Sequence, residues 1–373
     1  MKEPEIPDVA QECGTAPILS ASIMAHPRRA ENARRILAHL SPLRARIVFD
    51  PEPFGSPSTS RTARLAWRPW LRSATHHLVL QDDVVLHPRF VQQIQEAVAS
   101  QPRAALSFFS EWGSFTSNAL RVAALAGASW VSQPDTYLST VAMVLPTRDA
   151  ELASEFISQH PGDPDDECMG RFVQSRRMDH FVSNPNLVDH DVLSSLVGNG
   201  NHGVRRATNF VADTAAPATW WSTPPLDTPD RVPSLHWRTG TPSSYERSSE
   251  DAAVWTIAAQ RDHWGESQPA ISRIVRRSLE PLGFETRDIR FYNALLGAAL
   301  VLCDQIALAA TLDRRDGDFA SLCARSAVHS LAPGTLRGVA RNLGLDADSQ
   351  EIERTFIDIY ERVDALVRGS SAS

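Results

Sequence analysis

Two adjacent aspartates, Asp82 and Asp83, are the side chains in this sequence whose position most clearly suggests chemistry. Only Gln81 separates them from an apolar run, Leu78-Val79-Leu80, within the segment HHLVLQDDVVLHPRF. Charged groups resist burial unless they are paired or bind a metal, and ligands of open α/β sheets lie beyond the carboxyl ends of strands. A carboxylate pair there suits a hard divalent cation that also contacts phosphates. Because Asp also favours turns and N-caps, the pair could equally end a strand and cap the next helix.

The composition is that of an ordinary globular protein. The 373 residues, 42% hydrophobic and 22% charged, allow one large domain and a smaller one. A net charge of −7 gives no general attraction for nucleic acid, so no nucleic-acid partner is expected. The acidic, Pro-rich start MKEPEIPDVAQECG is unlike a signal or transit peptide, which predicts a cytoplasmic location. The widely spaced cysteines predict free thiols: Cys13, Cys168, Cys303 and Cys323.

One apolar run, Ala294 to Leu312, is long enough to be mistaken for a membrane span. Asp304 and Gln305 lie at its centre, where a charge costs roughly 2.5–3.5 kcal/mol on insertion scales. We therefore expect a buried core helix and no membrane partner.

Strands and helices alternate on both sides of the aspartate pair. Strand, helix, strand, helix and strand in succession predict a right-handed βαβ series, the skeleton of a nucleotide-binding α/β domain. The second helix is expected to continue at least to Arg68, with Pro69 bending it. The expected strands are 18–25, 46–49, 78–80, 104–109 and 138–145, and the expected helices are 30–40, 61–74, 88–99 and 117–126, with a further helix after the PDDE of residues 164–167.

The pattern divides the chain into four parts. Residues 1–14 are expected to be disordered, and 15–214 to form the nucleotide-binding and catalytic domain. Residues 215–250 read as a Pro/Trp-rich crossing segment, ordered because Trp220, Trp221 and Trp237 carry too much apolar surface for water. Residues 251–368 show long apolar stripes and are predicted to form an all-α C-terminal module.

Three segments together resemble the sugar-nucleotide half of a GT-A glycosyltransferase: ASIMAHPRR, VFDPEPFGSPSTSRTARLAW and HHLVLQDDVVLHPRF. The resemblance covers about residues 15–212 and implies a Rossmann-like GT-A domain with a mostly parallel central sheet and a D-x-D or E-D-D metal motif. It implies that Asp83 coordinates Mn²⁺ or Mg²⁺ and that Asp82 reaches the ribose or a metal-bound water. The implied donor is a nucleoside-diphosphate sugar, and a UDP-sugar is the first candidate. Gln81 stands where relatives often carry an acid, which leaves open how tightly the metal is held.

Basic and polar residues upstream of the aspartates are the expected donor contacts. The first strand would end beneath the base and ribose, and a guanidinium fork matches diphosphate oxygens. Arg61, Arg64 and Arg68 lie near one side of a helix, although they could equally form its solvated face. The donor contacts are His26, Arg28, Arg61 and Arg64.

Further donor and metal contacts are expected downstream. The family often supplies a late histidine to the metal, and His190 fits that place, with His202 as its rival. Arg205 and Arg206 would neutralise the leaving diphosphate, or face solvent. His76 and His77 are set aside as metal ligands because adjacent strand residues point to opposite faces.

An acidic cluster, Asp165, Asp166 and Glu167, precedes a helix, where the family typically places a catalytic acidic group. Asp166 is the first candidate for the base that takes the acceptor proton, followed by Asp165. The same cluster could instead stabilise the start of the helix.

A second candidate group, Glu111 and Trp112 with Phe115 nearby, would suit a sugar or peptide acceptor. Alternatively, the aromatic residues could belong to the core and Glu111 could be a surface acid.

These expectations describe a metal-dependent glycosyltransferase that moves a sugar to a soluble acceptor such as a natural product, peptide or glycan. The sequence does not choose between inversion and retention. One alternative is a nucleotidyltransferase, but no Gly-rich, Lys-bearing phosphate loop follows the first strand and Lys is nearly absent. The other is a non-catalytic platform for a protein partner. The helical module could dock such a partner, complete the acceptor site or build a homodimer.

Overall fold

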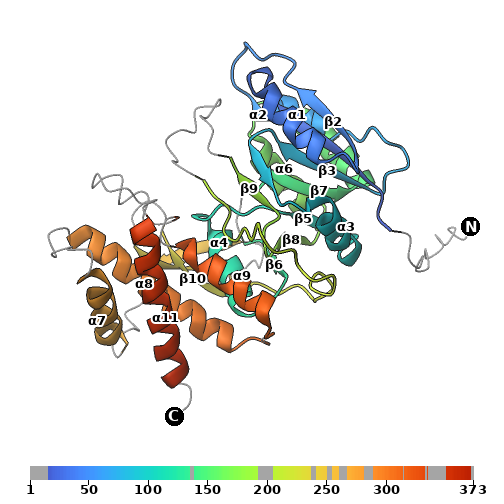
Figure 1. The fold of residues 1–373 in the computed structure, drawn as a ribbon. Coiled ribbons are helices and arrows are strands. Elements are labelled where there is room, and N and C mark those ends of the chain that lie inside the picture. The colour runs from blue at the N-terminus through green and yellow to red at the C-terminus, as the bar shows by residue number, and fades with distance from the viewer. Residues whose placement is uncertain are drawn as a thin grey trace, which may run out of the picture.

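A seven-stranded mixed sheet forms the centre of the N-terminal part of the chain (Figure 1). The computed structural model describes residues 16–134, 138–191, 205–236, 241–249, 254–259, 267–280, 289–313, 315–331, 334 and 350–370. The strands are β1 Leu19–Ala25, β2 Arg44–Phe49, β3 His76–Gln81, β5 Ala105–Ser107, β6 Trp130–Ser132, β7 Ala142–Pro146 and β8 His180–Ser183. They lie in the order β2-β1-β3-β7-β5-β8-β6, and only β7 and β6 run against their neighbours. The expected mostly parallel, Rossmann-like sheet is confirmed.

Helices cover both faces of this sheet because the apolar residues of the strands alternate. Leu78 and Leu80 of β3 pack on one face with Ile36 and Phe90, whereas Val79 packs on the other. Two helices lie on the first face, α1 Ala30–His39 and α3 Phe90–Ser100. Three lie on the second, α2 Thr59–Ala66, α5 Thr147–Ser158 and α6 Asp165–Ser175. The period-two alternation thus builds a three-layer α/β/α core.

Helix α2 ends earlier than the sequence predicts. Ser58 caps its start by accepting a hydrogen bond from Arg61 N at 3.3 Å, and Trp67 is its C-cap. The expectation that it continues to Arg68 is wrong, because Pro69 disfavours helical geometry at the preceding residue.

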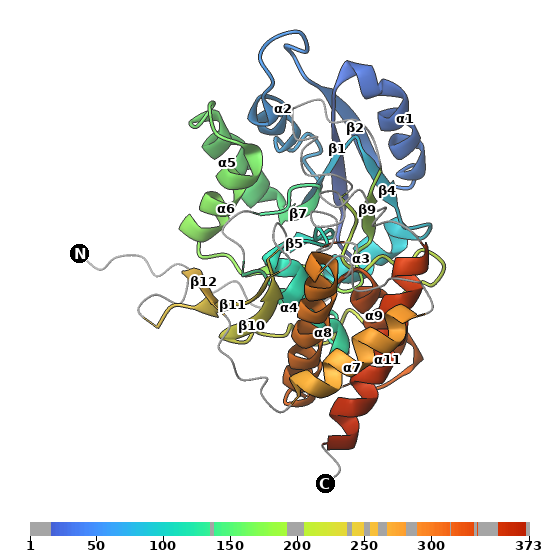
Figure 2. The same cartoon turned by 90° about the vertical axis from the view of Figure 1, so that its left-hand side faces the viewer.

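A second, antiparallel sheet of three strands packs beside α4 Phe115–Leu125 (Figure 2). Its strands are β10 Arg231–Leu235, β11 Pro242–Arg247 and β12 Trp255–Ala259. The prediction that residues 251–368 are wholly helical is therefore wrong at β12, where pairing with β11 decides the conformation. In the preceding crossing segment Trp220 and Trp221 are buried, as expected, and Trp237 lies outside the described residues.

The remaining elements of the described C-terminal part are helices, and they lie at the end of the molecule opposite α1 and α2 (Figures 1 and 2). It contains α7 Gln268–Leu279, α8 Ile289–Ala310, α9 Asp318–His329 and α11 Gln350–Ser370. By length and composition α8 is apolar enough to cross a membrane, and 61% of that stretch is buried here. Its Gln305 is fully buried and donates to Asn118 Oδ1 at 3.1 Å, which agrees with the expected core helix.

The described cysteines are buried free thiols, as expected: Cys168, Cys303 and Cys323. Cys13 lies outside the described residues, as does the 1–14 segment.

Candidate active site

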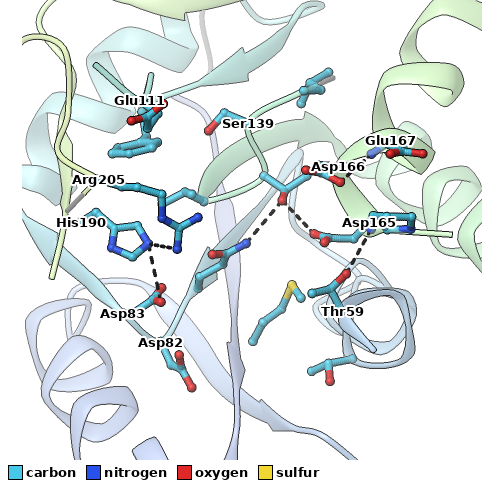
Figure 3. Close-up of a pocket in the computed structure, with 18 of the residues that line it drawn as sticks. Thr59, Asp82, Asp83, Glu111, Ser139, Asp165, Asp166, Glu167, His190 and Arg205 are labelled. Carbon is cyan, nitrogen blue, oxygen red and sulfur yellow. Dashed lines mark hydrogen bonds and ion pairs between the residues drawn. The ribbon is translucent and has the colours of Figure 1, made fainter. Parts of the chain in front are cut away.

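A cavity of about 1180 Å³ opens at the carboxyl ends of β1 and β3 (Figure 3). Pockets for drug-sized ligands measure about 300–1000 Å³, so this one is large enough for more than one small molecule. Ten residues expected at the site line it: His26, Arg28, Arg61, Asp82, Asp83, Glu111, Asp165, Asp166, His190 and Arg205. Three do not: Arg64, Trp112 and Arg206.

The aspartate pair lies in the short connection between β3 and β4 Val84–Leu86. Asp82 and Asp83 are 6% and 7% exposed. Asp82 Oδ2 accepts a hydrogen bond from the backbone N of His26 at 2.7 Å. Burial raises the pKa of Asp82, although the His26 N–H and Arg29 favour its charged form. The position expected from the sequence is confirmed, and the pair does not cap a helix, because a strand follows it.

His190 reaches the aspartate pair through a small second pairing. Strand β9 Val188–His190 runs antiparallel to β4, with His190 opposite Val84. The backbone N of Asp191 donates to the carbonyl of Asp83 at 2.8 Å, next to this pairing. His190 Nε2 consequently lies 3.6 Å from Asp83 Oδ2. Two residues far apart in the chain thus present an oxygen and a nitrogen to the same point. The rival, His202, lies outside the described residues.

These two side chains fit a hard divalent cation whose other ligands are water molecules and phosphate oxygens. Asp83 Oδ1 is buried and has no hydrogen-bond partner among the described residues. Within the same residues no three His, Cys, Asp or Glu side chains form a complete metal cluster. Mg²⁺, and by the same oxygen-rich chemistry Mn²⁺, is typically held by one or two carboxylates plus waters and substrate phosphates. Asp83 and His190 suit that incomplete type of site.

Arg29, which the sequence did not single out, contacts both aspartates. It ends the 3₁₀ turn Pro27–Arg29 after β1. Its Nη1 lies 3.0 Å from Asp82 Oδ1 and 2.7 Å from Asp83 Oδ2. Burial acts to lower the pKa of Arg29, but the two carboxylates outweigh it and raise that pKa. The neighbouring Arg28, which we expected at the donor, is exposed at the cavity rim.

Arg61 lines the cavity but is held by another carboxylate. Its Nε and Nη2 each lie 2.7 Å from an oxygen of Asp50, and Nη2 also donates to the carbonyl of Glu52 at 2.9 Å. Arg61 therefore orders the loop after β2, and its contact with a donor stays a prediction.

Arg64 and Arg206 are placed away from the cavity, which corrects their expected positions. Arg64, one helical turn beyond Arg61, faces a separate hollow of about 750 Å³ between α2 and the loop before α6. Arg206 forms an ion pair with Asp189, with 2.8 Å between Nη1 and Oδ2. Arg205 alone of the adjacent pair lines the cavity, with its Nη2 3.2 Å from His190 Nε2.

Across the cavity from the aspartate pair, the start of α6 carries the acidic cluster (Figure 3). Asp165 is buried and accepts a hydrogen bond from Thr140 Oγ1 at 2.7 Å. Gln81 Nε2 lies 3.4 Å from the same Thr140 Oγ1, so a hydrogen-bonded chain joins β3 to α6. Burial, and then the charge of Asp165, raise the pKa of Asp166 to about 6. A carboxylate with that pKa can accept a proton at neutral pH.

An aromatic column forms another wall of the cavity. Phe115 of α4 was expected near the acceptor, whereas the sequence did not predict the two residues that the second sheet adds, Tyr245 and Trp255. Phe115 stacks on Tyr245 with ring centroids 4.3 Å apart, and Tyr245 stacks on Trp255 at 5.3 Å. Ile257, two residues along β12 from Trp255, lines the same wall and is 51% exposed. The sequence signal that could have predicted this wall is the spacing of Trp255 and Ile257, which at two residues apart share one face of a strand.

Glu111 lies on the cavity as expected, but Trp112 does not. Trp112 is 7% exposed, and its carbonyl accepts a hydrogen bond from the buried Arg121 at 2.7 Å. A Cβ on Gly334 would lie 2.7 Å from that carbonyl, so Trp112 packs tightly against the C-terminal part. The expected acceptor contact of Trp112 is corrected to a core position.

The two histidines set aside as metal ligands do point apart. His76 Nε2 lies 2.8 Å from the carbonyl of Pro102, and His77 Nε2 lies 2.8 Å from that of Ala66. Burial lowers the pKa of His77 to about 4. Both are neutral structural residues at physiological pH.

Comparison of the sequence with protein-family models and with curated proteins gives no match. Among solved structures, the chain is similar to the mannosyltransferase PcManGT from Pyrobaculum calidifontis, solved in complex with GDP-Man and Mn²⁺. The two share 12% identity, and the match covers 99% of this chain and 92% of that one with a TM-score of 0.28. At that TM-score the similarity carries no argument about fold or function, which rest on the geometry above.

Proposed function

We propose that this protein is a metal-dependent glycosyltransferase of GT-A type that transfers a sugar from a nucleoside-diphosphate sugar to a soluble acceptor. The observation that carries the proposal is the arrangement of one cavity. It holds a buried aspartate pair with a nearby histidine, the side chains of four arginines, and an acidic helix start opposite them. A diphosphate needs positive charge and a hydroxyl nucleophile needs a base, and this cavity offers both.

In the proposed reaction Asp83 and His190 would hold a divalent cation, which when bound would supply positive charge beside the diphosphate. Arg205 and Arg29 add guanidinium donors for the phosphate oxygens. His26 and Asp82, at the ends of β1 and β3, face the ribose. This assignment places the donor on the β1–β3 side of the cavity.

Asp166 serves as the base in the inverting form of the reaction. The acceptor hydroxyl gives its proton to the Asp166 carboxylate while its oxygen forms a bond to the anomeric carbon. The bond from that carbon to the diphosphate oxygen breaks, and the electron pair leaves with the diphosphate. Asp165, held by Thr140, positions the start of α6 and raises the proton affinity of its neighbour. The acceptor lies along Glu111 and the aromatic wall.

The test is a donor screen by slow hydrolysis, which needs no knowledge of the acceptor. UDP-, GDP- and dTDP-sugars are incubated with protein and Mn²⁺, and the products are identified by mass. Release of free sugar and nucleoside diphosphate supports the proposal. Asp83→Asn is expected to lose this activity, whereas Asp149→Asn, on the outer helix α5 and paired with Arg176, is expected to retain it.

Other outcomes separate the alternatives. Products that carry a nucleotide, with release of pyrophosphate, would indicate a nucleotidyltransferase. No hydrolysis, together with no metal-dependent heat for any nucleoside diphosphate in calorimetry, would indicate a non-catalytic platform.

A further inference from the structure

Asp83 and His190 face each other through Oδ2 and Nε2, and an arginine contacts each of these two atoms. Arg29 Nη1 is 2.7 Å from Asp83 Oδ2, the same oxygen that lies 3.6 Å from His190 Nε2. Arg205 Nη2 lies 3.2 Å from that Nε2. The oxygen and the nitrogen that face each other are therefore already in contact with guanidinium groups from two directions, whereas the other oxygen of Asp83, Oδ1, has no hydrogen-bond partner among the described residues.

The hydrogen bonds of His190 define the role of its Nε2. Its Nδ1 lies 2.9 Å from the backbone carbonyl of Asp191. A carbonyl only accepts, so Nδ1 carries the proton in the neutral ring and Nε2 has the lone pair. The contact with Arg205 is then a hydrogen bond that the guanidinium donates to that lone pair.

Burial makes these contacts hard for a bare cation to displace. The side chains of Arg29 and Asp83 are only 13% and 9% exposed, so the ion pair is poorly screened by water. A divalent ion entering alone would meet the positive charge of Arg29 at the carboxylate and that of Arg205 at the imidazole. A diphosphate changes this balance, because its oxygens match a guanidinium fork and bring several negative charges.

We infer that Arg29 and Arg205 couple the donor diphosphate to the cation. Without the donor they hold Asp83 Oδ2 and the lone pair of His190 Nε2, and when the diphosphate binds they turn to its oxygens and release both of these atoms. This inference rests on the proposed function and gives its two phosphate-binding arginines a second role, which is to hold the metal ligands before the donor binds. Coupling of this kind is reciprocal and typically changes affinity by about 5- to 150-fold.

The test is a titration with Mn²⁺ followed by electron paramagnetic resonance, in which free Mn²⁺ gives the signal. Wild type, Arg29→Met and Arg205→Met are titrated alone and with saturating UDP or GDP. Wild type is expected to bind Mn²⁺ weakly alone and about 5- to 150-fold more tightly with the diphosphate that it prefers. Each variant is expected to bind Mn²⁺ more tightly than wild type when no nucleotide is present, and to gain less from the diphosphate.

Arg34→Met is the matched control, because Arg34 is an exposed arginine on α1 that does not line the cavity. It is expected to behave as wild type. Should Arg29→Met fail to fold, as judged by its melting curve, Arg205→Met decides by the same criterion, since Arg205 makes no contact with the aspartates in the described structure.

Two results would overturn the inference while leaving the proposed function intact. One is wild-type Mn²⁺ affinity that is the same with and without nucleotide in a protein that hydrolyses a sugar nucleotide. The other is nucleotide-free affinity that stays unchanged or falls in the folded variants. Absence of Mn²⁺ binding by wild type with every diphosphate, together with no hydrolysis, overturns both proposals.

Discussion

Nε2 of His190 lies 3.6 Å from Oδ2 of Asp83, although 106 residues separate them in the chain. The pairing of β4 with β9 maintains this approach, because it places His190 directly opposite Val84. A short strand pair therefore builds the proposed metal site, rather than a local sequence motif.

The first prediction concerns His190→Ala in the presence of nucleoside diphosphate. Removal of the imidazole nitrogen is expected to weaken Mn²⁺ binding at least about 10-fold, the lower range of effects seen around metal sites. The β4–β9 backbone pairing is retained, so the melting temperature should change little. Titration of Mn²⁺ by electron paramagnetic resonance measures the first effect. His39→Ala, an exposed histidine on α1, is the control, and equal affinity in both variants would remove His190 from the site.

The second prediction is the pH dependence of kcat/KM for an inverting reaction. The pKa of Asp166 is raised to about 6, so activity is expected to fall as the pH drops through that value and the base becomes protonated. Asp166→Asn should lose most activity and the acid limb with it. Asp163→Asn, an exchange at an aspartate paired with Arg171 outside the main cavity, should keep the wild-type profile.

Stability gives an independent check on Asp166. A raised pKa means that the folded state disfavours the ionised carboxylate, so Asp166 reduces stability as the pH rises from its usual pKa of 3.8 through about 6. Asp166→Asn removes that charge and should melt no lower than wild type at pH 8. A lower melting temperature there would show that the ionised form supports the fold.

The sequence predicted the sheet and the aspartate pair for a simple reason. The apolar and small residues of β1 and the apolar run of β3 are typical of buried strands, and Asp82 follows the last residue of β3. The direction in which a side chain points from a turn could not be predicted in this way. Arg28 and Arg29 are adjacent and chemically identical, and only the geometry of the 3₁₀ turn directs Arg29 to the carboxylates.

Long-range pairing explains the other differences. Residues 254–259 carry apolar side chains that suit a helix or a strand, and the partner strand β11 decides between them. Trp112 and Glu111 are neighbours in sequence, yet one packs under Arg121 and the other lines the cavity. Neither outcome is encoded in the local pattern.

The third prediction tests the aromatic wall. Trp255→Ala is expected to raise the KM of any acceptor that supports turnover up to about 10-fold, since an aromatic contact contributes about 0.5–1.5 kcal/mol. Donor hydrolysis in the absence of acceptor should stay unchanged, because Trp255 lies on the β12 wall of the cavity and the donor is proposed to bind on the β1–β3 side. Val254→Ala is the control, since Val254 is exposed and does not line the cavity. A loss of donor hydrolysis in Trp255→Ala would assign this wall to the donor.

The fourth prediction concerns Arg121, a fully buried arginine of α4 that joins the two halves of the protein. It donates from Nε to the carbonyl of Ala327 at 3.0 Å and from Nη2 to Trp112 O and Ser330 Oγ at 2.7 and 3.0 Å. Burial lowers its pKa to about 9, which still leaves it charged at pH 7.

Arg121→Met should lower the free energy of unfolding, because it removes the charged donor from those buried oxygens, although Trp112 O and Ala327 O keep the hydroxyls of Ser117 and Ser330 as donors. Hydrogen bonds to charged groups contribute about 1.5–3 kcal/mol each, and methionine recovers part of the loss through packing. Urea denaturation measures the change, with Arg273→Met on the exposed side of α7 as the control. The free energy of unfolding of Arg121→Lys should lie between that of Arg121→Met and that of the control. An ammonium keeps the charge but lacks the planar fork that reaches Trp112 and Ala327 together. A midpoint equal to wild type in Arg121→Met would mean that apolar contacts alone, such as those of Val122 and Leu125 with the helices, hold the C-terminal part in place.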